Sequence, residues 1–571
     1  MDDVVTGSEQ TGRGVDRPES RTEGPGADKI RPRLVTELID RAVANHGDRT
    51  AIDFLGRHWT YAQIGDLVDR AAKGLQAAGV GPDTRFGLCL PNTPYFVILY
   101  FAALKCGATI VNFNPLYVEH ELRHQIRDSG TTFMAVPDLK MIEDKVRAVA
   151  AESGLKTIIV CPMADILPLA QSIGFRLFKR SETAHWVDGD GLHLNFRALV
   201  DNDGAFTPAT RSPDDVAVLQ YTGGTTGVPK GAMLTHANLT ANSAQMILHV
   251  GGKPGQQDRI MGVLPMFHVF ALTTVLNFSI DTAAEMILLP RFELKQFLKT
   301  AKRTKPTKLL AVPTMLTAIN KAAAEHPIHF DGLEFTVSGG APLPFDVRNQ
   351  FEALTGCRVV EGYGLSEASP IITCNPCYGE ARDNSAGPAF PGTVIEIRDL
   401  EDPTKIVPLG ERGEVCARGP QVMKGYWNRP EDTAKVMVDG ALRTGDVGYL
   451  DDEGYLFLVD RIKDVIICGG YNVYPRVIEE ALYDHPAVAE AVVIGVPDEY
   501  RGQAPKAFVT IRVDHQATIE ELADYLKSRV SKIELPREIE IRDSLPKTMI
   551  GKLSKKELVE EEARKSAQKS A

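Results

Sequence analysis

Cysteine is scarce in this chain, with eight residues in 571. They are scattered, and the lone Cys-x-x-Cys, Cys374 to Cys377, has no second pair at zinc spacing. A disulfide-rich secreted fold and a zinc or redox motif are therefore disfavoured, and reduced, unpaired thiols are expected. The first residues are polar and acidic, without the pattern of a secretory signal, so the sequence predicts cytoplasmic localisation.

Positive charge is also in deficit, because 64 Lys and Arg residues stand against 75 Asp and Glu residues, for a net charge of −11. A general nucleic-acid binder usually presents a basic face, so no nucleic-acid partner is expected. The deficit does not exclude ATP or coenzyme A, because their sites need positive charge only locally.

Long uninterrupted apolar runs are missing as well. Tyr95–Val111 is broken by a lysine and a glycine, and Met261–Ile280 contains a proline, a histidine and an asparagine. Both are predicted to be buried core rather than membrane spans. Residues 165–179 mix apolar and basic side chains, which favours a partly packed surface helix. Peripheral attachment to the inner membrane through this segment stays open, as does a homodimer.

The length is too great for one core and predicts at least two domains. Residues 1–30 have almost no apolar side chains and are expected to be disordered. Short apolar segments then alternate with helical patterns, which is typical of layered α/β architecture. We predict a large N-terminal α/β domain over 31–460 with a small antiparallel β subdomain near 392–417. A small, mobile α+β C-terminal domain follows over 461–565, with a hinge at 460–464.

A loop rich in glycine and threonine is the most informative feature. Residues 221–236 read Tyr-Thr-Gly-Gly-Thr-Thr-Gly-Val-Pro-Lys-Gly-Ala-Met-Leu-Thr-His and follow an apolar, strand-like run. Small residues allow the backbone N–H groups, the hydroxyls and the Lys230 ammonium to surround phosphate oxygens. It is not a Walker loop, because Lys230 is followed by glycine and a second strand-like stretch, with a helix predicted only from the Thr235 cap.

This string closely resembles the phosphate loop of the adenylate-forming enzymes, which include acyl-CoA synthetases, peptide-synthetase adenylation domains and luciferases. The resemblance implies ATP binding, with the phosphates held by Thr222, Gly223, Gly224, Thr225, Thr226, Gly227 and Lys230.

A second motif, Glu361 to Glu367, reads Glu-Gly-Tyr-Gly-Leu-Ser-Glu. Tyr363 offers a ring on which adenine could stack, Ser366 can reach a phosphate oxygen, and Glu367 is a hard oxygen ligand suited to Mg²⁺. The family usually has threonine where this chain has Ser366, and the hydroxyl is retained. The resemblance implies an AMP-binding role for Glu361, Gly362, Tyr363, Gly364 and Ser366.

Further segments match the family in the same order along the chain. The resemblance implies that Gly339, Gly340, Ala341 and Pro342 line the adenine and acyl pockets, that Asp446 and Arg461 bind the ribose, and that Phe267 and His268 position the acid. It further implies a hinge at Lys463 and a coenzyme A passage along Gly469, Gly470, Tyr471 and Asn472. The catalytic residues that it implies are Lys552, Lys230 and Glu367.

The chain is accordingly interpreted as an ATP-dependent acyl-CoA ligase that uses Mg²⁺ with ATP and coenzyme A as co-substrate. It is most similar in pattern to the bacterial medium- and long-chain fatty acyl-CoA ligases. Dicarboxylates such as pimelate and aryl acids such as coumarate stay open as substrates. A fatty acyl-AMP ligase, a luciferase-type oxygenase and a non-catalytic nucleotide-binding scaffold are the other readings, the last made improbable by Glu367 and Lys552 together.

Overall fold

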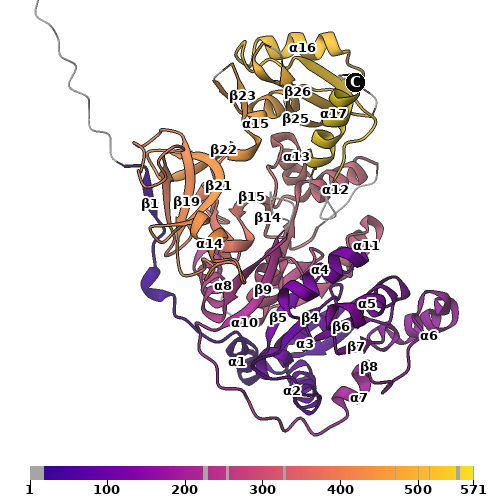
Figure 1. Ribbon diagram of the computed structural model, residues 1–571. Coiled ribbons are helices and arrows are strands. Elements are labelled where there is room, and N and C mark those ends of the chain that lie inside the picture. Colours follow the sequence, from indigo (N-terminus) through magenta and orange to yellow (C-terminus); the bar gives the residue numbers. More distant parts are fainter. Residues whose placement is uncertain are drawn as a thin grey trace, which may run out of the picture.

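The computed structural model describes residues 19–222, 229–251, 256–325, 330–469, 471–498, 500–513, 515–547 and 553–569. Gly223, Gly224, Thr225, Thr226 and Gly227 of the predicted phosphate loop lie outside these ranges, as do Gly470 and Lys552. The described chain contains four sheets, and Figure 1 shows two of them in the larger lower part of the molecule, with the C-terminal sheet above.

The first large sheet has seven strands in the order β10-β9-β5-β4-β6-β7-β8. Its strands are parallel except for β10, which pairs antiparallel with β9 and forms the hairpin that carries the phosphate-loop motif. The bounds are β4 Arg85–Leu88, β5 Thr109–Asn112, β6 Phe133–Pro137, β7 Thr157–Cys161, β8 His193–Asn195, β9 Val216–Thr222 and β10 Lys230–Thr235.

The second large sheet has eight strands in the order β16-β15-β14-β13-β11-β12-β2-β3 and is parallel except at its two edges. The bounds are β2 Thr50–Phe54, β3 Arg57–Thr60, β11 Arg259–Gly262, β12 Glu285–Leu288, β13 Lys308–Ala311, β14 Phe335–Gly339, β15 Arg358–Gly364 and β16 Ile371–Cys374. Parallel strands that alternate with helices confirm the predicted α/β class.

A third sheet is antiparallel and runs β1-β18-β19-β21-β22-β17, with β20 paired to β21. Its strands are β1 Arg21–Glu23, β17 Gly387–Pro388, β18 Val394–Arg398, β19 Gly413–Arg418, β20 Met437–Val438, β21 Ala441–Leu450 and β22 Tyr455–Arg461. The antiparallel pairing predicted within 392–417 is present as β18 and β19. Disorder was expected up to residue 30. That expectation is wrong for residues 19–30, because β1 gains main-chain hydrogen bonds from β18 despite its polar sequence.

The fourth sheet lies in the C-terminal part and runs β24-β23-β26-β25, with β27 paired to β26. Its strands are β23 Ile466–Cys468, β24 Tyr471–Val473, β25 Val488–Asp498, β26 Gly502–Ile511 and β27 Glu538–Ile541. This sheet has a hydrophobic core of its own with α15 and α16, built around Ile478, Val493 and Leu522. We call residues 466–569 the small unit. The predicted division of the chain near residue 460 stays a prediction.

The helices of the N-terminal half are α1 Thr36–His46, α2 Tyr61–Ala77, α3 Pro94–Lys105, α4 Glu119–Ser129, α5 Lys140–Ser153, α6 Leu169–Phe178, α7 Phe196–Val200, α8 His236–Val250, α9 Val269–Ala271 and α10 Phe278–Asp281. Those that follow are α11 Leu294–Thr304, α12 Pro313–Glu325, α13 Phe345–Thr355, α14 Pro430–Val436, α15 Pro475–Tyr483, α16 Ile519–Lys527 and α17 Lys555–Lys569. Short helical turns are η1 Ala27–Lys29, η2 Met163–Asp165, η3 Arg180–Glu182, η4 Leu272–Asn277 (a π-helix), η5 Ser366–Ala368 and η6 Ile462–Asp464.

The most apolar helix, α3, is buried from Pro94 to Leu104 and joins the core shared by the two large sheets. The apolar run at Met261–Ile280 is likewise core, as predicted from its polar interruptions. Among the described residues, no helix combines the length and the hydropathy that crossing a bilayer requires. Thr235 caps α8 as predicted: its hydroxyl accepts from the N–H of Asn238, whose side chain returns a bond to the Thr235 N–H.

A charged side chain is buried in the small unit. Lys506 on β26 is 3% exposed, and its Nζ lies 2.8, 3.0 and 3.1 Å from carboxylate oxygens of Glu538, Glu540 and Glu562. Burial raises the pKa of Glu540 and Glu562, but hydrogen bonds from Lys506 and other cations outweigh it. Both pKa values therefore lie below the ordinary value of 4.5.

A carboxylate whose pKa is lowered by folding adds stability above its unfolded pKa and loses that stability as the pH falls toward the folded value. We therefore expect the melting temperature of the protein to decrease as the pH is lowered from 4.5. Lys506→Met is expected to cost about 3 kcal/mol at neutral pH, because it removes the buried cation that three carboxylates share, and to flatten that acid slope. Thermal unfolding followed across pH measures both. The exposed Lys527→Met serves as control, and equal slopes in wild type and Lys506→Met would contradict the assignment.

Candidate active site

The β9–β10 hairpin brings the two ends of the predicted phosphate loop together. Thr222 at the end of β9 is the direct cross-strand partner of Lys230 at the start of β10. Gln220, two residues earlier, donates from Nε2 to the carbonyl of Phe267 at 3.0 Å and accepts from Asn112 at 3.1 Å. The hairpin therefore fixes Thr222 and Lys230 beside each other, next to the segment predicted to position the acid.

Lys230 lies within a compact polar cluster. Its Nζ is 3.2 Å from the carboxylate of Asp432 and 5.4 Å from the centre of the Tyr426 ring. The hydroxyl of Tyr426 donates to Oε1 of Glu367 at 2.8 Å. The structure thus joins Lys230 and Glu367, which come from separate motifs, through one tyrosine. We call Lys230, Glu367, Tyr426 and Asp432 the Tyr426 cluster.

Local backbone contacts explain why Tyr426 and Asp432 reach this place. The segment before α14 runs along β10: the N–H of Met233 donates to the Gly425 carbonyl, and the N–H of Trp427 donates to the Gly231 carbonyl, both at 2.8 Å. The N–H of Met423 donates to the Glu367 carbonyl at 2.7 Å, which also fixes that residue. The sequence prediction did not include Tyr426 or Asp432. The run Lys-Gly-Tyr-Trp at 424–427 was the available signal, but nothing in it names a partner on β10.

A second group forms where β15 meets β21 and β22. Asp446 and Arg461 are direct cross-strand partners, with Nε of Arg461 3.3 Å from the Asp446 carboxylate. The hydroxyl of Tyr363 donates to the other oxygen of Asp446. Burial raises the pKa of Asp446, while the charge of Arg461 and the Tyr363 hydrogen bond lower it, and burial dominates. The structure brings together three residues that the resemblance assigns to one nucleoside.

The segment from Gly339 to Leu343 lies directly beside the second motif. Gly339 pairs with Gly362 across β14 and β15, and the N–H of Leu343 donates to Oε2 of Glu361 at 3.2 Å. Gly340 has a φ of +82°, which favours glycine, and Ala341 and Pro342 follow it. Burial raises the pKa of Glu361. Gly364 has no space for a side chain, because a Cβ there would lie 2.0 Å from the Pro370 carbonyl oxygen. Ser366 opens η5 and is half-buried.

The aromatic segment after β11 borders the same place. His268 caps α9, its Nδ1 accepting from the N–H of Phe270 at 3.2 Å. The ring of Phe270 lies against Gly339, where an added Cβ would come within 3.0 Å of it. Phe270 therefore contacts both predicted regions, His268 through its main-chain N–H and Gly339 through its ring. The sequence prediction did not include Phe270, although it lies only two residues after His268.

The predicted coenzyme A segment lies elsewhere in this conformation. β23 and β24 form a hairpin in which Cys468 pairs with Tyr471, and Gly469 makes the turn with a φ of +58°. Tyr471 is 68% exposed, and Asn472 is also exposed. No contact between this hairpin and the Tyr426 cluster is found among the described residues. The predicted hinge residue Lys463 lies in the short turn η6, directly between β22 and β23.

Lys552 lies outside the described residues, but the flanks of its loop are placed. Lys547 and Leu553 form an antiparallel bridge, and the N–H of Ser554 donates to the Pro546 carbonyl at 2.8 Å. Lys555, just beyond, pairs with the buried carboxylate of Glu479 at 3.0 Å. The N–H of Arg476, at the start of α15, donates to Asp460 at 2.8 Å and so ties the small unit to β22.

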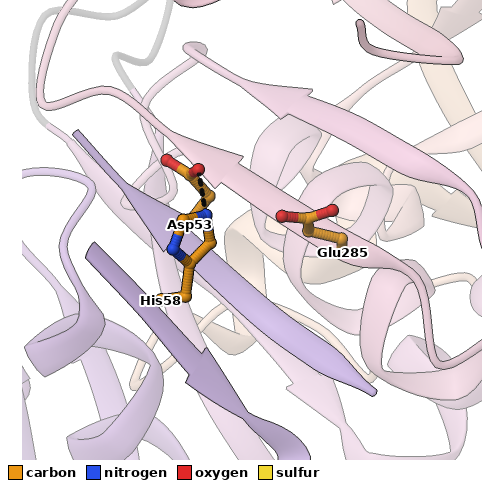
Figure 2. Close-up of side chains that lie close together, drawn as sticks. All are labelled: Asp53, His58 and Glu285. Atoms are coloured by element: carbon orange, nitrogen blue, oxygen red, sulfur yellow. Dashed lines mark ion pairs between the residues drawn. The ribbon is translucent and has the colours of Figure 1, made fainter. Parts of the chain in front are cut away.

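A separate polar group, shown in Figure 2, consists of Asp53, His58 and Glu285, whose ligand-type atoms all lie within 4.8 Å of one another. Arg303 already neutralises Asp53, donating to it at 2.7 Å, and His58 lies 2.8 Å from the same carboxylate. Burial raises the pKa of Asp53, but the Arg303 contact outweighs it and holds the pKa below its ordinary value. With an arginine in place, this group is an ion-pair network and needs no metal. All eight cysteines are free and buried.

Comparisons with known proteins agree with this geometry. The sequence model described as AMP-binding enzyme matches residues 39–427, and the one described as AMP-binding enzyme C-terminal domain matches residues 477–552. A long-chain-fatty-acid–CoA ligase of Bacillus subtilis is 39% identical over 540 residues, which cover 93% of this chain and 95% of that protein.

Two solved structures are similar over most of their length. ATP-bound MatB from Rhodopseudomonas palustris is 30% identical, with a TM-score of 0.80, and the match covers 93% of this chain and 99% of that one. The O-succinylbenzoate coenzyme A synthetase MenE from Bacillus subtilis, in complex with ATP and a magnesium ion, is 27% identical. Its TM-score is 0.75, and the match covers 91% of this chain and 99% of that one. Both family models match this chain in the expected order, and the first covers the motifs that the structure brings together. This chain belongs to the AMP-binding enzyme family.

Proposed function

We propose that this protein is an ATP-dependent acyl-CoA ligase that forms AMP and acts on medium- or long-chain fatty acids. The observation that carries the proposal is the Tyr426 cluster, which joins the phosphate-loop lysine to the carboxylate suited to a metal ion. The Bacillus subtilis relative, matched over nearly its whole length, supports a fatty acid as the substrate.

Two displacements make up the reaction. An oxygen of the substrate carboxylate attacks the α-phosphorus of ATP, the bond from that phosphorus to the bridging oxygen breaks, and pyrophosphate leaves. The coenzyme A thiolate then attacks the acyl carbon, the bond from that carbon to the AMP oxygen breaks, and AMP leaves. The thiol proton goes to solvent. Activation is necessary because an oxide is a poor leaving group, whereas AMP is a good one.

Lys230 and Thr222 would hold the departing pyrophosphate together with the N–H groups of the loop between them. Asp432 contacts Lys230 at 3.2 Å through one carboxylate oxygen and Lys435 at 3.5 Å through the other, so it would keep Lys435 as a partner when Lys230 turns to the phosphate. Oε1 of Glu367 is oriented by Tyr426, and a carboxylate oxygen is a ligand that Mg²⁺ prefers. Mg²⁺ bound there with ATP would supply further neutralisation of the phosphate charge.

The nucleoside is assigned to the group around Asp446. A carboxylate can accept from both ribose hydroxyls, and Arg461 beside it fixes its orientation. Tyr363 presents its ring while its hydroxyl is held by Asp446. Glu361, Gly362, Gly364 and the stretch Gly340–Pro342 would shape the adenine pocket, with glycines where the backbone comes close.

The acid is assigned to the space bordered by Phe267, His268, Phe270 and Gly339. Aromatic rings against a glycine give an apolar wall suited to a hydrocarbon chain. His268 serves in positioning. The name of MenE shows that an aryl acid is handled elsewhere in the family, so aryl acids and dicarboxylates belong in any substrate panel.

The second step needs a different placement of the small unit. We assign the hinge to Lys463 within 460–464, the larger part to 31–460 and the mobile part to 461–565. The exposed hairpin that carries Gly469, Tyr471 and Asn472, with Gly470 between them, would approach the acyl-adenylate after adenylation and guide the thiol. Lys552 would contact the carboxylate and the α-phosphate only during the first step.

The deciding experiment measures pyrophosphate and AMP release from ATP with a series of acids of increasing chain length, with and without coenzyme A. Fatty acids are expected to release pyrophosphate, and coenzyme A to allow repeated turnover with acyl-CoA as product. A fatty acyl-AMP ligase would stop at the adenylate when coenzyme A is added. No acid-dependent release with any member of the panel would contradict the proposal.

Lys552→Ala is expected to slow adenylation by about 100-fold or more, because it removes the charge that stabilises the first transition state. Thioester formation from supplied acyl-adenylate should stay near the wild-type rate, since the lysine would by then be withdrawn. Single-turnover kinetics of each half-reaction measure the split, with the exposed Lys556→Ala as matched control. Equal loss in both half-reactions would argue against the rearrangement as well as the role.

Tyr426→Phe removes the hydroxyl that orients Glu367 but keeps the ring over Lys230. Loss of a hydrogen bond to a charged group predicts an adenylation rate about tenfold lower. Partial recovery at raised Mg²⁺ concentration is expected, because the metal ligand is disordered rather than absent. Kinetics across Mg²⁺ concentrations test this against the exposed Tyr500→Phe. A loss that Mg²⁺ leaves unchanged would assign Tyr426 a purely structural role.

A further inference from the structure

Helix α6 turns its apolar side toward solvent. Leu169, Ile173 and Leu177 lie four residues apart and share one face of the helix, and they are 79%, 52% and 68% exposed. Phe178, the last residue of the helix, is 82% exposed. No residue of α6 is buried. We call Leu169, Ile173 and Leu177 the α6 strip.

The inward side of the helix does not account for this arrangement. Phe175 is the α6 side chain that packs, partly buried, against the main core. Figure 1 shows α6 at the outer edge of the molecule, far from the small unit. An ordinary surface helix places its apolar face against the core and its polar face in water. In α6, Phe175 packs inward but Leu169, Ile173 and Leu177 face water together, which marks an interaction surface rather than scattered exposure.

The surroundings of the strip are cationic. The α6 helix and the turn that follows it, residues 169–182, carry three positive side chains, Arg176, Lys179 and Arg180, against one acidic residue, Glu182, which pairs with Lys179. This local excess stands out in a chain whose net charge is −11. A positively charged margin around an apolar strip is the pattern of a helix that lies at the surface of an anionic bilayer.

A depression of about 640 Å³ opens beside the N-terminal end of α6. Arg57, Arg176 and Arg197 line it together with Leu167 and Leu169. The carboxylate of Asp165 pairs with Arg176 at 2.9 Å and also with Arg197, while Arg57 donates to the main-chain carbonyl of the same residue, so three guanidinium groups gather around one carboxylate. The remaining positive charge is suited to a phosphate group, and the leucines at the rim are suited to the acyl chains beneath it.

We propose that α6 docks this protein on a membrane surface that contains anionic phospholipids, with the α6 strip in the acyl boundary and the surrounding arginines and lysines on the headgroup phosphates. A second copy of the chain fits less well as the occupant. A two-fold contact through the strip would bring two sets of Arg176, Lys179 and Arg180 toward each other, and like charges oppose such a contact. Bilayer binding does not require catalysis, so this proposal is independent of the assigned reaction.

Flotation of the full chain with vesicles tests the proposal. Vesicles of phosphatidylcholine containing phosphatidylglycerol are expected to carry the protein upward, and high salt should weaken that binding because the charge interaction is screened. Vesicles of phosphatidylcholine alone should bind it at least about tenfold more weakly. Equal binding to both kinds of vesicle, or no binding to the anionic ones, would overturn the assignment to an anionic surface.

Paired variants separate the two contributions. The triple change Leu169→Gln, Ile173→Gln and Leu177→Gln leaves the charge unaltered and is expected to weaken binding about 100-fold. Lys179→Gln with Arg180→Gln is expected to weaken it about tenfold and to reduce its dependence on salt.

The matched control, Ile519→Gln, Ile541→Gln and Val559→Gln, replaces exposed apolar residues of the small unit and should bind like wild type. Melting temperatures, and ligase rates with an acid supplied in solution, should be unchanged in the α6 variants, which separates loss of docking from loss of fold. Wild-type binding by the triple α6 variant would overturn the proposal. A wild-type dimer that the triple variant dissociates, without vesicle binding, would assign the strip to a second copy instead.

Discussion

The proposed active site depends on one ammonium group, that of Lys230, which has to be stabilised by the fold and still be able to turn toward the phosphates of ATP. An ammonium group without a partner between strands would lower the stability of the fold. An ammonium group bound too tightly to a carboxylate could not bind the substrate. Lys230 has partners but is not enclosed by them: its Nζ lies 3.2 Å from Asp432 and close to the ring of Tyr426. The β9–β10 hairpin fixes where the lysine starts, and the segment before α14 supplies both of its neighbours. The hydroxyl of Tyr426 donates to Glu367, so the same tyrosine contacts Lys230 and fixes the Glu367 carboxylate.

The sequence was sufficient for the features that are local. Apolar runs of four to seven residues between helical patterns led to the α/β class, and the Thr235 cap follows from hydroxyl and amide groups three residues apart. A glycine allows another main-chain segment to come close, and Gly364 of the second motif leaves no room for a side chain. The long motif strings led to the family because each one constrains many neighbouring positions at once.

Contacts between distant segments were beyond the same reasoning. Nothing in the run around Tyr426 shows that its hydroxyl would meet Glu367, because that meeting depends on how a loop follows β10. Phe270 was missed for a similar reason: an apolar residue in an apolar run looks like core until Gly339 is found beneath it. The prediction of disorder for residues 19–30 is wrong because composition alone does not show that β18 has an edge available for pairing. That edge supplies main-chain hydrogen bonds that a polar segment cannot make by itself.

Strand β1 has a consequence for where this protein begins as a folded object. The matched family segment starts at residue 39, yet Arg21–Glu23 already pair with β18 and close one side of the antiparallel sheet. A chain cut at the start of that segment would keep every residue of the proposed active site and would still expose the main-chain donors and acceptors of β18. An exposed sheet edge can pair with extended segments of other chains. Strand β1 therefore protects the protein against aggregation without taking part in the reaction.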